Sequence, residues 1–383
     1  MKEILWITNG WLHDLGGGRT IASARIIRHL AQEGYKINVI NFERKKHAYT
    51  KRNRVVRHKN ILFDHRFLNS NKALIFEAIN ISRRKKDEII ICSGFAYIDL
   101  LILVIHYLLY RHKGKKIILY EHTFPRGSIL NQSELYKYLF LIIAKLFYSR
   151  FDHIVTTNHR MKDVFVRYYG VLPRKVTVIP YPIINKNFHA KKMMDLKEKI
   201  YHYKNKKIIL TAARLDLVQK DFFTLLKAFA LTIDKVKNAY LVILGTGRHE
   251  IKIKEFAKKL KIYKFIYFAG YKPNPYKYMF RSDVFVLSSK FEGTGMVLVE
   301  AMASGLPIVS TDSPVGPRET LEDGKDGVLV PVGNAFAMSR AIIRILTSKN
   351  TRRKLIISGL KRARDFEFRT ALNQWLTFLN KFE

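Results

Sequence analysis

Short apolar runs alternate with amphipathic stretches along most of the chain. In the first half, runs with the length and composition of strands occupy 4–8, 36–41, 88–92, 116–120, 153–156 and 176–179. Apolar residues recur with helical spacing at 20–32, 98–112, 133–150 and 159–169. Such alternation is typical of parallel sheets with helices on both faces, because each parallel strand pair needs a crossover connection. The pattern therefore predicts an α/β fold.

The alternation is interrupted once. Pro180 and Pro182 are followed by a lysine-rich segment without clear periodicity, and the pattern resumes at residue 207. Strand-like runs then lie at 207–212, 240–244, 265–268, 284–287 and 307–310, with helical spacing at 221–233, 249–261 and 296–304. We predict two α/β domains, at 1–183 and 207–360, a linker at 184–206, and a C-terminal helix at 361–383 that packs back on the first domain. Ligands of such sheets bind beyond the carboxyl ends of the strands.

The composition of the chain excludes several classes of protein. It has 383 residues, of which 48% are hydrophobic, and this rules out a disordered protein. The single cysteine, Cys92, excludes a disulfide framework and a cysteine-based zinc site. The first residues do not resemble a signal peptide, and the longest apolar run, 98–110, is too short to span a bilayer. We expect a cytoplasmic protein, soluble or peripheral to a membrane.

The chain is strongly basic. It has 69 Lys and Arg residues against 31 Asp and Glu, a net charge of +38, and the excess is present in both halves. One cluster, which we call the basic cluster, contains no acid and consists of Arg44, Lys45, Lys46, Lys51, Arg52, Arg54, Arg57 and Lys59. The basic cluster has three alternative explanations: a bias in composition, binding to a nucleic acid, or binding to an anionic membrane. Because no nucleic-acid-binding motif accompanies the charge, we favour the membrane over nucleic acid.

A glycine-rich loop follows the first predicted strand. Gly16, Gly17 and Gly18 would let backbone N–H groups and a helix N-terminus approach an anion. A dinucleotide site would use Gly16 and Gly18 with Glu43, but the third glycine is missing and the loop is too long for the tight turn. A purely structural loop is the other alternative.

Two later segments carry charges that suit a phosphorylated ligand. Arg214 and Lys220 lie between a predicted strand and a helix, and two fixed cations suit a diphosphate. Glu292 lies in a glycine-rich loop, and Glu300 follows on an otherwise apolar helix face. The N-terminus of that helix, at 295–297, would direct free N–H groups at an anion. A carboxylate in apolar surroundings needs partners, which would be either ribose hydroxyls or a neighbouring backbone group.

Together these residues resemble the glycosyltransferases of family 4. The resemblance rests on Glu292 and Glu300, which are separated by seven residues, on Arg214 with Lys220, on Gly17-Gly18, and on 244–247. The segment 311–319 is similar to the bacterial subset that builds O-antigen, capsule and lipid-linked oligosaccharides. The resemblance implies the GT-B fold, in which two Rossmann-like domains face a central cleft.

The resemblance also implies a role for each matched residue. Arg214 and Lys220 would stabilise the departing diphosphate, Glu300 would hold the ribose hydroxyls, and Glu292 would hold those of the transferred sugar. His122 matches the family's cleft-facing histidine, and we count it with the catalytic residues. The other donor contacts would come from the backbone of Gly295, Met296 and Val297, from Gly17 and Gly18, and from Tyr271 near the base.

The implied reaction moves a hexose or N-acetylhexosamine from a nucleotide diphosphate sugar to a lipid-linked or polysaccharide acceptor, with retention of configuration. The expected donor is a UDP-linked sugar. Neither a metal nor another cofactor is expected, because two cations and a helix N-terminus already stabilise the leaving diphosphate. Because a lipid-linked acceptor lies in a membrane and the basic cluster suits an anionic surface, we expect the protein at the inner face of the cytoplasmic membrane. The apolar helix at 136–148 either joins that contact or belongs to the core.

Two other classes of function remain open. One is a nicotinamide-dependent oxidoreductase that uses Gly16, Gly18 and Glu43. The other is a nonenzymatic basic protein that binds lipid or nucleic acid. In that second class, Glu300 would have no role in ligand binding.

Overall fold

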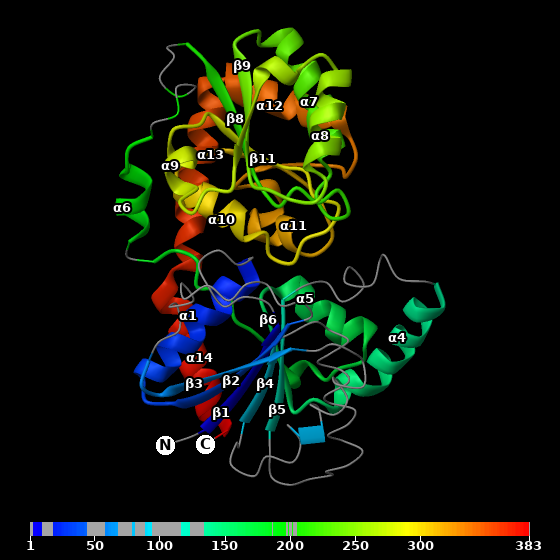
Figure 1. The fold of residues 1–383 in the computed structure, drawn as a ribbon, viewed down its shortest axis with the longest axis vertical. Helices are drawn as coiled ribbons and strands as arrows, with labels where there is room; N and C mark the ends of the chain where they lie inside the picture. Colours follow the sequence, from blue (N-terminus) through cyan, green and yellow to red (C-terminus); the bar gives the residue numbers. More distant parts are fainter. Residues whose placement is uncertain are drawn as a thin grey trace. The chain divides into compact units, whose positions relative to one another are not determined.

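The computed structural model describes residues 3–9, 18–43, 58–67, 79–80, 89–93, 116–122, 134–185, 187–196, 198, 201 and 205–382. The chain divides into two compact units (Figure 1). The first unit comprises Met1–Pro182 and Arg369–Glu383, and the second comprises Ile183–Phe368. Each unit is built on one parallel sheet, which confirms the predicted α/β class with two Rossmann-like halves.

The described part of the first unit holds a seven-stranded sheet in the order β3-β2-β1-β4-β5-β6-β7. Its strands are β1 (Glu3–Asn9), β2 (Lys36–Glu43), β3 (Ile61–Phe67), β4 (Ile89–Ser93), β5 (Lys116–Glu121), β6 (His153–Thr156) and β7 (Val176–Val178). Its helices are α1 (Gly18–Gln32), α4 (Glu134–Phe147), α5 (His159–Asp163) and α14 (Phe368–Leu379), and a π-helical turn, Val164–Tyr168, follows α5. Every residue of β4 is buried, as expected for a strand with helices over both faces.

An aromatic cluster fastens α14 to the first sheet. The ring centroid of Trp375 lies 5.7 Å from that of Trp6 on β1 and 4.9 Å from that of Tyr120 on β5. All three side chains are buried. Because such rings bury a large apolar area, they help to attach this helix to the sheet.

The second unit holds a six-stranded sheet in the order β10-β9-β8-β11-β12-β13. Its strands are β8 (Lys207–Ala212), β9 (Ala239–Leu244), β10 (Ile266–Gly270), β11 (Val284–Leu287), β12 (Ile308–Thr311) and β13 (Val328–Val330). Its helices are α6 (Phe188–Met193), α7 (Phe222–Lys235), α8 (Glu250–Lys259), α9 (Tyr276–Phe280), α10 (Met296–Ala303), α11 (Gly316–Thr320), α12 (Ala335–Thr347) and α13 (Lys349–Ala363). The chain order changes direction between β8 and β11, so this neighbouring pair is the topological switch point.

The predicted boundaries need two corrections. The segment expected to be a linker, 184–206, contains α6, whose Phe188 packs on Tyr276 of α9 with ring centroids 4.6 Å apart. The C-terminal helix expected at 361–383 is α14, which begins at Phe368, because residues 361–363 still belong to α13. The chain passes from one unit to the other twice, at 182–183 and at 368–369. The segments beside these two crossings are hydrogen-bonded, because the N–H of Phe368 donates to the carbonyl of Ile184 at 2.9 Å.

Besides α6, several elements were not expected from the sequence, namely β3, β13, α9, α11, α12 and α13. The helix expected at 98–112 lies outside the described residues. The one expected at 159–169 is divided into α5 and the π-helical turn after it. Among the described helices, none is both long and apolar enough to cross a membrane.

Candidate active site

Most of the predicted site residues lie in loops at the carboxyl edge of the second sheet. Arg214 and Lys220 follow β8, Tyr271 follows β10, and Glu292 follows β11. Because β8 and β11 are neighbours at the switch point, the loops that follow them lie side by side at this edge of the sheet. The fold therefore brings Lys220 and Glu292 to the position where ligands of such sheets bind.

The loops after β8 and β11 are joined by backbone pairing. Lys220 and Ser289 form an antiparallel bridge, and the N–H of Asp221 donates to the carbonyl of Ser288 at 2.8 Å. The Asp221 carboxylate then accepts the N–H of Thr224 at 3.1 Å and so caps α7. This pairing fixes the position from which the Lys220 side chain extends.

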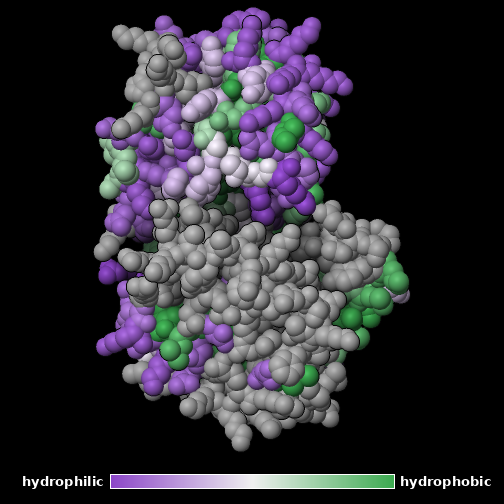
Figure 2. Space-filling view, viewed as in Figure 1, coloured by the Kyte–Doolittle hydropathy of each residue, from purple (hydrophilic) through white to green (hydrophobic). Residues whose placement is uncertain are grey.

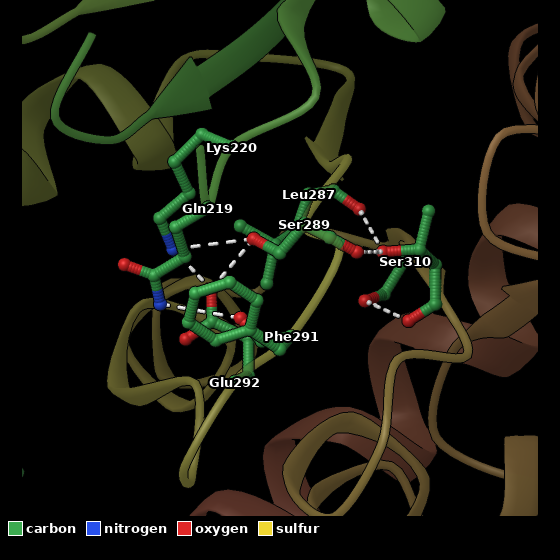
Figure 3. A network of polar contacts seen from close by, with 8 residues as sticks. Gln219, Lys220, Leu287, Ser289, Phe291, Glu292 and Ser310 are labelled. Atoms are coloured by element: carbon green, nitrogen blue, oxygen red, sulfur yellow. Dashed lines mark hydrogen bonds and ion pairs between the residues drawn. The ribbon is translucent and has the colours of Figure 1, made fainter. Parts of the chain in front are cut away.

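Lys220, Glu292 and Ser289 form a compact polar cluster (Figure 3). The Lys220 ammonium donates to Oε1 of Glu292, and the Ser289 hydroxyl donates to the same oxygen at 2.6 Å. Lys220 Nζ also lies 3.2 Å from Ser289 Oγ. The side chains of Lys220 and Glu292 are 14% and 9% exposed, so the pair is largely removed from water. A pair in such surroundings is strongly coupled.

Ser289 is itself held from the next strand. The hydroxyl of Thr311, at the end of β12, donates to the carbonyl of Ser289 at 2.6 Å. Ser289 is fully buried, and its sequence position gave no signal, because a single serine after a strand is common. It is a site residue that sequence analysis missed.

The loop that carries Arg214 lies against the glycines after β9. The N–H of Leu215 donates to the carbonyl of Thr246 at 3.0 Å. A Cβ added to Gly245, whose φ is +131°, would overlap the carbonyl oxygen of Ala213. The segment 244–247 is therefore rich in glycine because two backbones meet there. Arg214 itself is exposed.

Asp216 stabilises the same loop. Burial by itself would raise the pKa of its carboxyl, but hydrogen bonds from the N–H of Val218 and from Arg248 hold that pKa below its usual value. The two donors lie 3.0 Å and 3.2 Å from Oδ1 of Asp216. The charged carboxylate therefore ties the loop after β8 to that after β9.

Glu300 lies on α10, the helix that begins directly after the loop that carries Glu292. Gly295 precedes this helix with φ +72°, a left-handed conformation that favours glycine. Met296 and Val297 form the first turn, where N–H groups have no partner within the helix. The hydroxyl of Tyr276 donates to Oε1 of Glu300 at 3.1 Å. Tyr276 was not predicted as a site residue, and Tyr271, which was, is 44% exposed in the loop after β10.

Of the predicted site residues in the first unit, the structure describes His122, directly after β5, and Gly18, at the start of α1. His122 is buried, and its Nε2 and Nδ1 lie 2.7 Å from Ser93 Oγ and 2.7 Å from Tyr181 Oη. The hydroxyls fix the orientation of the ring. Gly18 is the first residue of α1, and Gly17 lies outside the described residues.

Other predicted features are described only in part. Of the basic cluster, residues 44–57 lie outside the described residues, and Lys59 is exposed. Glu43, named for the oxidoreductase alternative, is the last residue of β2. Among the described residues, no group of three His, Cys, Asp or Glu side chains could hold a metal ion. The predicted independence from metals and cofactors stays a prediction.

Two family models together match most of the chain. Residues 193–362 match "Glycosyl transferases group 1", and residues 16–184 match "Glycosyltransferase Family 4". The two matches meet near the boundary between the units.

Curated relatives carry names of the same kind. An uncharacterised glycosyltransferase of Methanocaldococcus jannaschii is 27% identical over 295 residues, which are 68% of this chain and 70% of that protein. N-acetylgalactosamine-N,N'-diacetylbacillosaminyl-diphospho-undecaprenol 4-alpha-N-acetylgalactosaminyltransferase of Campylobacter jejuni is 29% identical over 59% of each chain. A lipopolysaccharide core biosynthesis glycosyltransferase of Rhizobium meliloti is 34% identical over 37% of this chain. The chain spans 40% of the length of the Rhizobium protein.

Solved structures extend the likeness over the whole chain. Sucrose-phosphate synthase from Thermosynechococcus elongatus has a TM-score of 0.77 at 18% identity and covers 100% of this chain and 99% of its own. Anabaena HepE in complex with UDP and glucose has a TM-score of 0.76 at 15% identity and covers 100% of both chains. At these identities the likeness shows the fold alone, which is the predicted GT-B fold.

Proposed function

The chain belongs to glycosyltransferase family 4, and we propose that it transfers a hexose or N-acetylhexosamine from a UDP-sugar to a lipid-linked or polysaccharide acceptor in surface glycan synthesis. The names of relatives support the acceptor class, since those from Campylobacter jejuni and Escherichia coli both specify a diphospho-undecaprenol acceptor. The name of the Escherichia coli relative also specifies a UDP-linked donor.

The observation that carries this proposal is the cluster of Lys220, Glu292 and Ser289 at the switch point. Before the donor binds, the ammonium and the carboxylate neutralise each other in a largely buried position. A donor diphosphate would draw the Lys220 ammonium toward its own charge. Glu292 would then accept hydrogen bonds from hydroxyls of the transferred sugar. The cluster thus offers one cation for the leaving group and one acceptor for the sugar.

Lys220, together with Arg214, would promote departure of the diphosphate. Arg214, Lys220 and the N-terminus of α10 place positive charge where negative charge develops in the transition state. We propose that this charge replaces a metal ion. The acceptor oxygen bonds to the anomeric carbon as the bond to the diphosphate breaks, and the acceptor's proton passes to the departing phosphate. Attack from the same face through an oxocarbenium-like transition state retains the configuration.

An exposed apolar helix supports the proposal that the protein binds to a membrane surface. Along α4, six large apolar side chains are 40% to 68% exposed, namely Leu135, Tyr138, Leu139, Ile142, Ile143 and Leu146. Figure 2 shows this apolar surface, and the exposed Lys145 and Arg150 lie on or just after the helix. Core packing accounts for Phe140 and Ala144, which are buried, but not for the six exposed residues. A helix with an apolar face beside basic residues suits an anionic bilayer.

A donor-hydrolysis screen without acceptor tests the proposed function. The full-length protein is incubated with UDP-glucose, UDP-galactose, their N-acetyl derivatives and GDP-mannose, and nucleotide release is measured. We expect release of UDP from at least one UDP-sugar. In parallel, a thermal-shift assay compares UDP with NADH. Stabilisation by NADH, together with no release from any sugar nucleotide, would favour the oxidoreductase alternative and overturn the proposal.

A further inference from the structure

A turn after β12 braces the loop that carries Glu292. We call 291–295 the glutamate loop and 313–316 the brace turn. Val315 in the turn forms a parallel bridge with Glu292 in the loop. A Cβ added to Gly316 would overlap the carbonyl oxygen of Gly293, so the two backbones touch there. Two consecutive residues of the loop are therefore held by two consecutive residues of the turn.

The contact continues into the helix after the turn. The hydroxyl of Thr320, on α11, donates to the carbonyl of Thr294 at 2.7 Å, and both side chains are buried. Arg318 pairs with Asp312, with Nε at 3.0 Å from Oδ1, and this pair links the residues on either side of the brace turn. Three successive residues of the glutamate loop, 292 to 294, are thus held from the β12 side.

The brace turn has a strained backbone. Val315 has φ +79° and ψ −72°, and the N–H of Gly316 donates to the carbonyl of Pro314 at 3.2 Å. This is the rare three-residue turn whose central residue has a positive φ, and a β-branched side chain fits it poorly. The Ser313 hydroxyl is buried and has no hydrogen-bond partner within the part of the chain that the structure describes. Both features cost stability, and such costs persist where function needs the geometry.

We propose that Val315 is a positioning residue for Glu292. Lys220 and Ser289 orient the carboxylate from the β8 and β11 side, and the brace turn fixes the backbone of the same residue from the β12 side. The strained turn aims the carboxylate at the sugar of the donor rather than stabilising the fold. This inference rests on the role proposed for Glu292 in sugar binding.

The substitution Val315→Gly separates positioning from structure, because glycine tolerates the turn without strain. We expect the unfolding temperature to stay the same or rise, the kcat of donor hydrolysis to fall about tenfold, and the affinity for UDP to stay unchanged. Lys261→Gly is the matched control: Lys261 has φ +58°, is exposed, and lies after α8, away from the glutamate loop. This control should keep the wild-type kcat. A more stable Val315→Gly enzyme with wild-type kcat would overturn the inference.

A second pair of variants decides the question if Val315→Gly fails to fold. Thr320→Val removes the hydroxyl that holds Thr294 and should lower kcat with little change in UDP affinity, and Thr320→Ser should restore it. Equal kcat for both variants would contradict the brace.

The substitution Glu292→Gln distinguishes the proposed role of Glu292 in sugar binding from the proposed positioning role of Val315. If it keeps wild-type turnover, the role of Glu292 itself is wrong, whereas if it loses turnover while the Val315 and Thr320 variants do not, only the brace is wrong.

Discussion

The ammonium of Lys220 and the carboxylate of Glu292 are paired although the residues are 72 positions apart and belong to different loops. Each loop follows one strand of the pair at the switch point, so the topology of the sheet creates the contact. The Ser289 hydroxyl, 2.6 Å from the same carboxylate oxygen, completes the cluster. The cluster therefore follows from the fold rather than from any local sequence motif.

The first prediction concerns the stability of this ion pair. Lys220→Met leaves the carboxylate of Glu292 buried without its cation, which should lower the free energy of unfolding by about 3 kcal/mol. The double variant Lys220→Met/Glu292→Gln removes both charges and should recover much of that loss. Denaturant unfolding of the two variants measures the difference. Equal destabilisation by the single and double variants would contradict the coupling.

The second prediction concerns nucleotide binding by Glu300. Glu300→Gln should weaken UDP binding about tenfold, because an amide accepts hydrogen bonds from ribose hydroxyls less strongly than a carboxylate does. Tyr276→Phe should have a smaller effect, since Tyr276 orients Glu300 through a hydrogen bond of 3.1 Å. Titration calorimetry with UDP checks both variants, with Glu250→Gln on α8 as the control. Unchanged UDP affinity in Glu300→Gln is the result expected of a nonenzymatic basic protein.

The third prediction concerns the close approach of two backbones at Gly245. Gly245→Ala combines a positive φ with an overlap against Ala213, so it should destabilise the second unit and displace the loop that carries Arg214. Gly333→Ala is the matched control, because Gly333 has φ +79° but no atom within 4 Å of the added Cβ. Thermal unfolding should show the larger loss for Gly245→Ala. Similar losses in both variants would mean that φ alone matters.

The fourth prediction concerns the pH dependence of α14 docking. Burial, followed by the nearby positive charges of Lys381, Lys175 and Lys162, lowers the pKa of His153 to about 4, and Asp152 opposes this shift. His153 packs against Phe378 of α14, with ring centroids 4.9 Å apart. In the unfolded chain a histidine takes up its proton near pH 6.5, so stability should fall as the pH drops from 6.5 toward 4.

The measurement for His153 compares unfolding temperatures at pH 7.5 and pH 4.5 in the wild type and in His153→Asn. Asparagine has no proton to gain in this range, so the variant should lose less stability on acidification than the wild type does. An equal loss in both proteins would assign the acid sensitivity to other groups.

The fifth prediction concerns the apolar face of α4. Ile142→Asp places a charge among the exposed apolar residues and should weaken binding to phosphatidylglycerol vesicles about tenfold. Ile251→Asp is the control, because Ile251 is 72% exposed on α8 of the second unit. Vesicle sedimentation measures both, with phosphatidylcholine vesicles as the uncharged reference. Equal binding to the two kinds of vesicle would remove the electrostatic part of the proposal.

The sequence pattern predicted most strands because a strand with helices over both faces reads as a continuous apolar run, as in β4 and β9. It missed β3, whose centre contains Asp64, His65 and Arg66, and such a run resembles a surface loop. It missed α6 because a short lysine-rich helix has no clear apolar periodicity. Its apolar residue Phe188 packs against α9, a contact that no local pattern encodes.

The residues of the candidate site likewise include some that the sequence predicted and some that it did not. Glu292 and Glu300 were identified as carboxylates in a glycine-rich loop and on an apolar helix face. Lys220 was identified with Arg214, as one of two cations between a strand and a helix. Ser289 and Tyr276 were not, because a lone hydroxyl becomes a partner only when the sheet brings its loop beside a carboxylate. The pairing of Lys220 with Glu292 likewise depends on how 219–221 align with 288–290, and that alignment is set by the neighbouring strands.

The most direct test of the central claim is the turnover of the donor sugar by Lys220→Ala and Glu292→Ala. Each variant should lose at least about two orders of magnitude in kcat, or about 3 kcal/mol of transition-state stabilisation. Lys254→Ala is the matched control, because Lys254 pairs with Glu250 at 2.6 Å on α8, and it should keep the wild-type rate. If both site variants are folded, as judged by circular dichroism, and transfer sugar at the wild-type rate, the account of this site is contradicted.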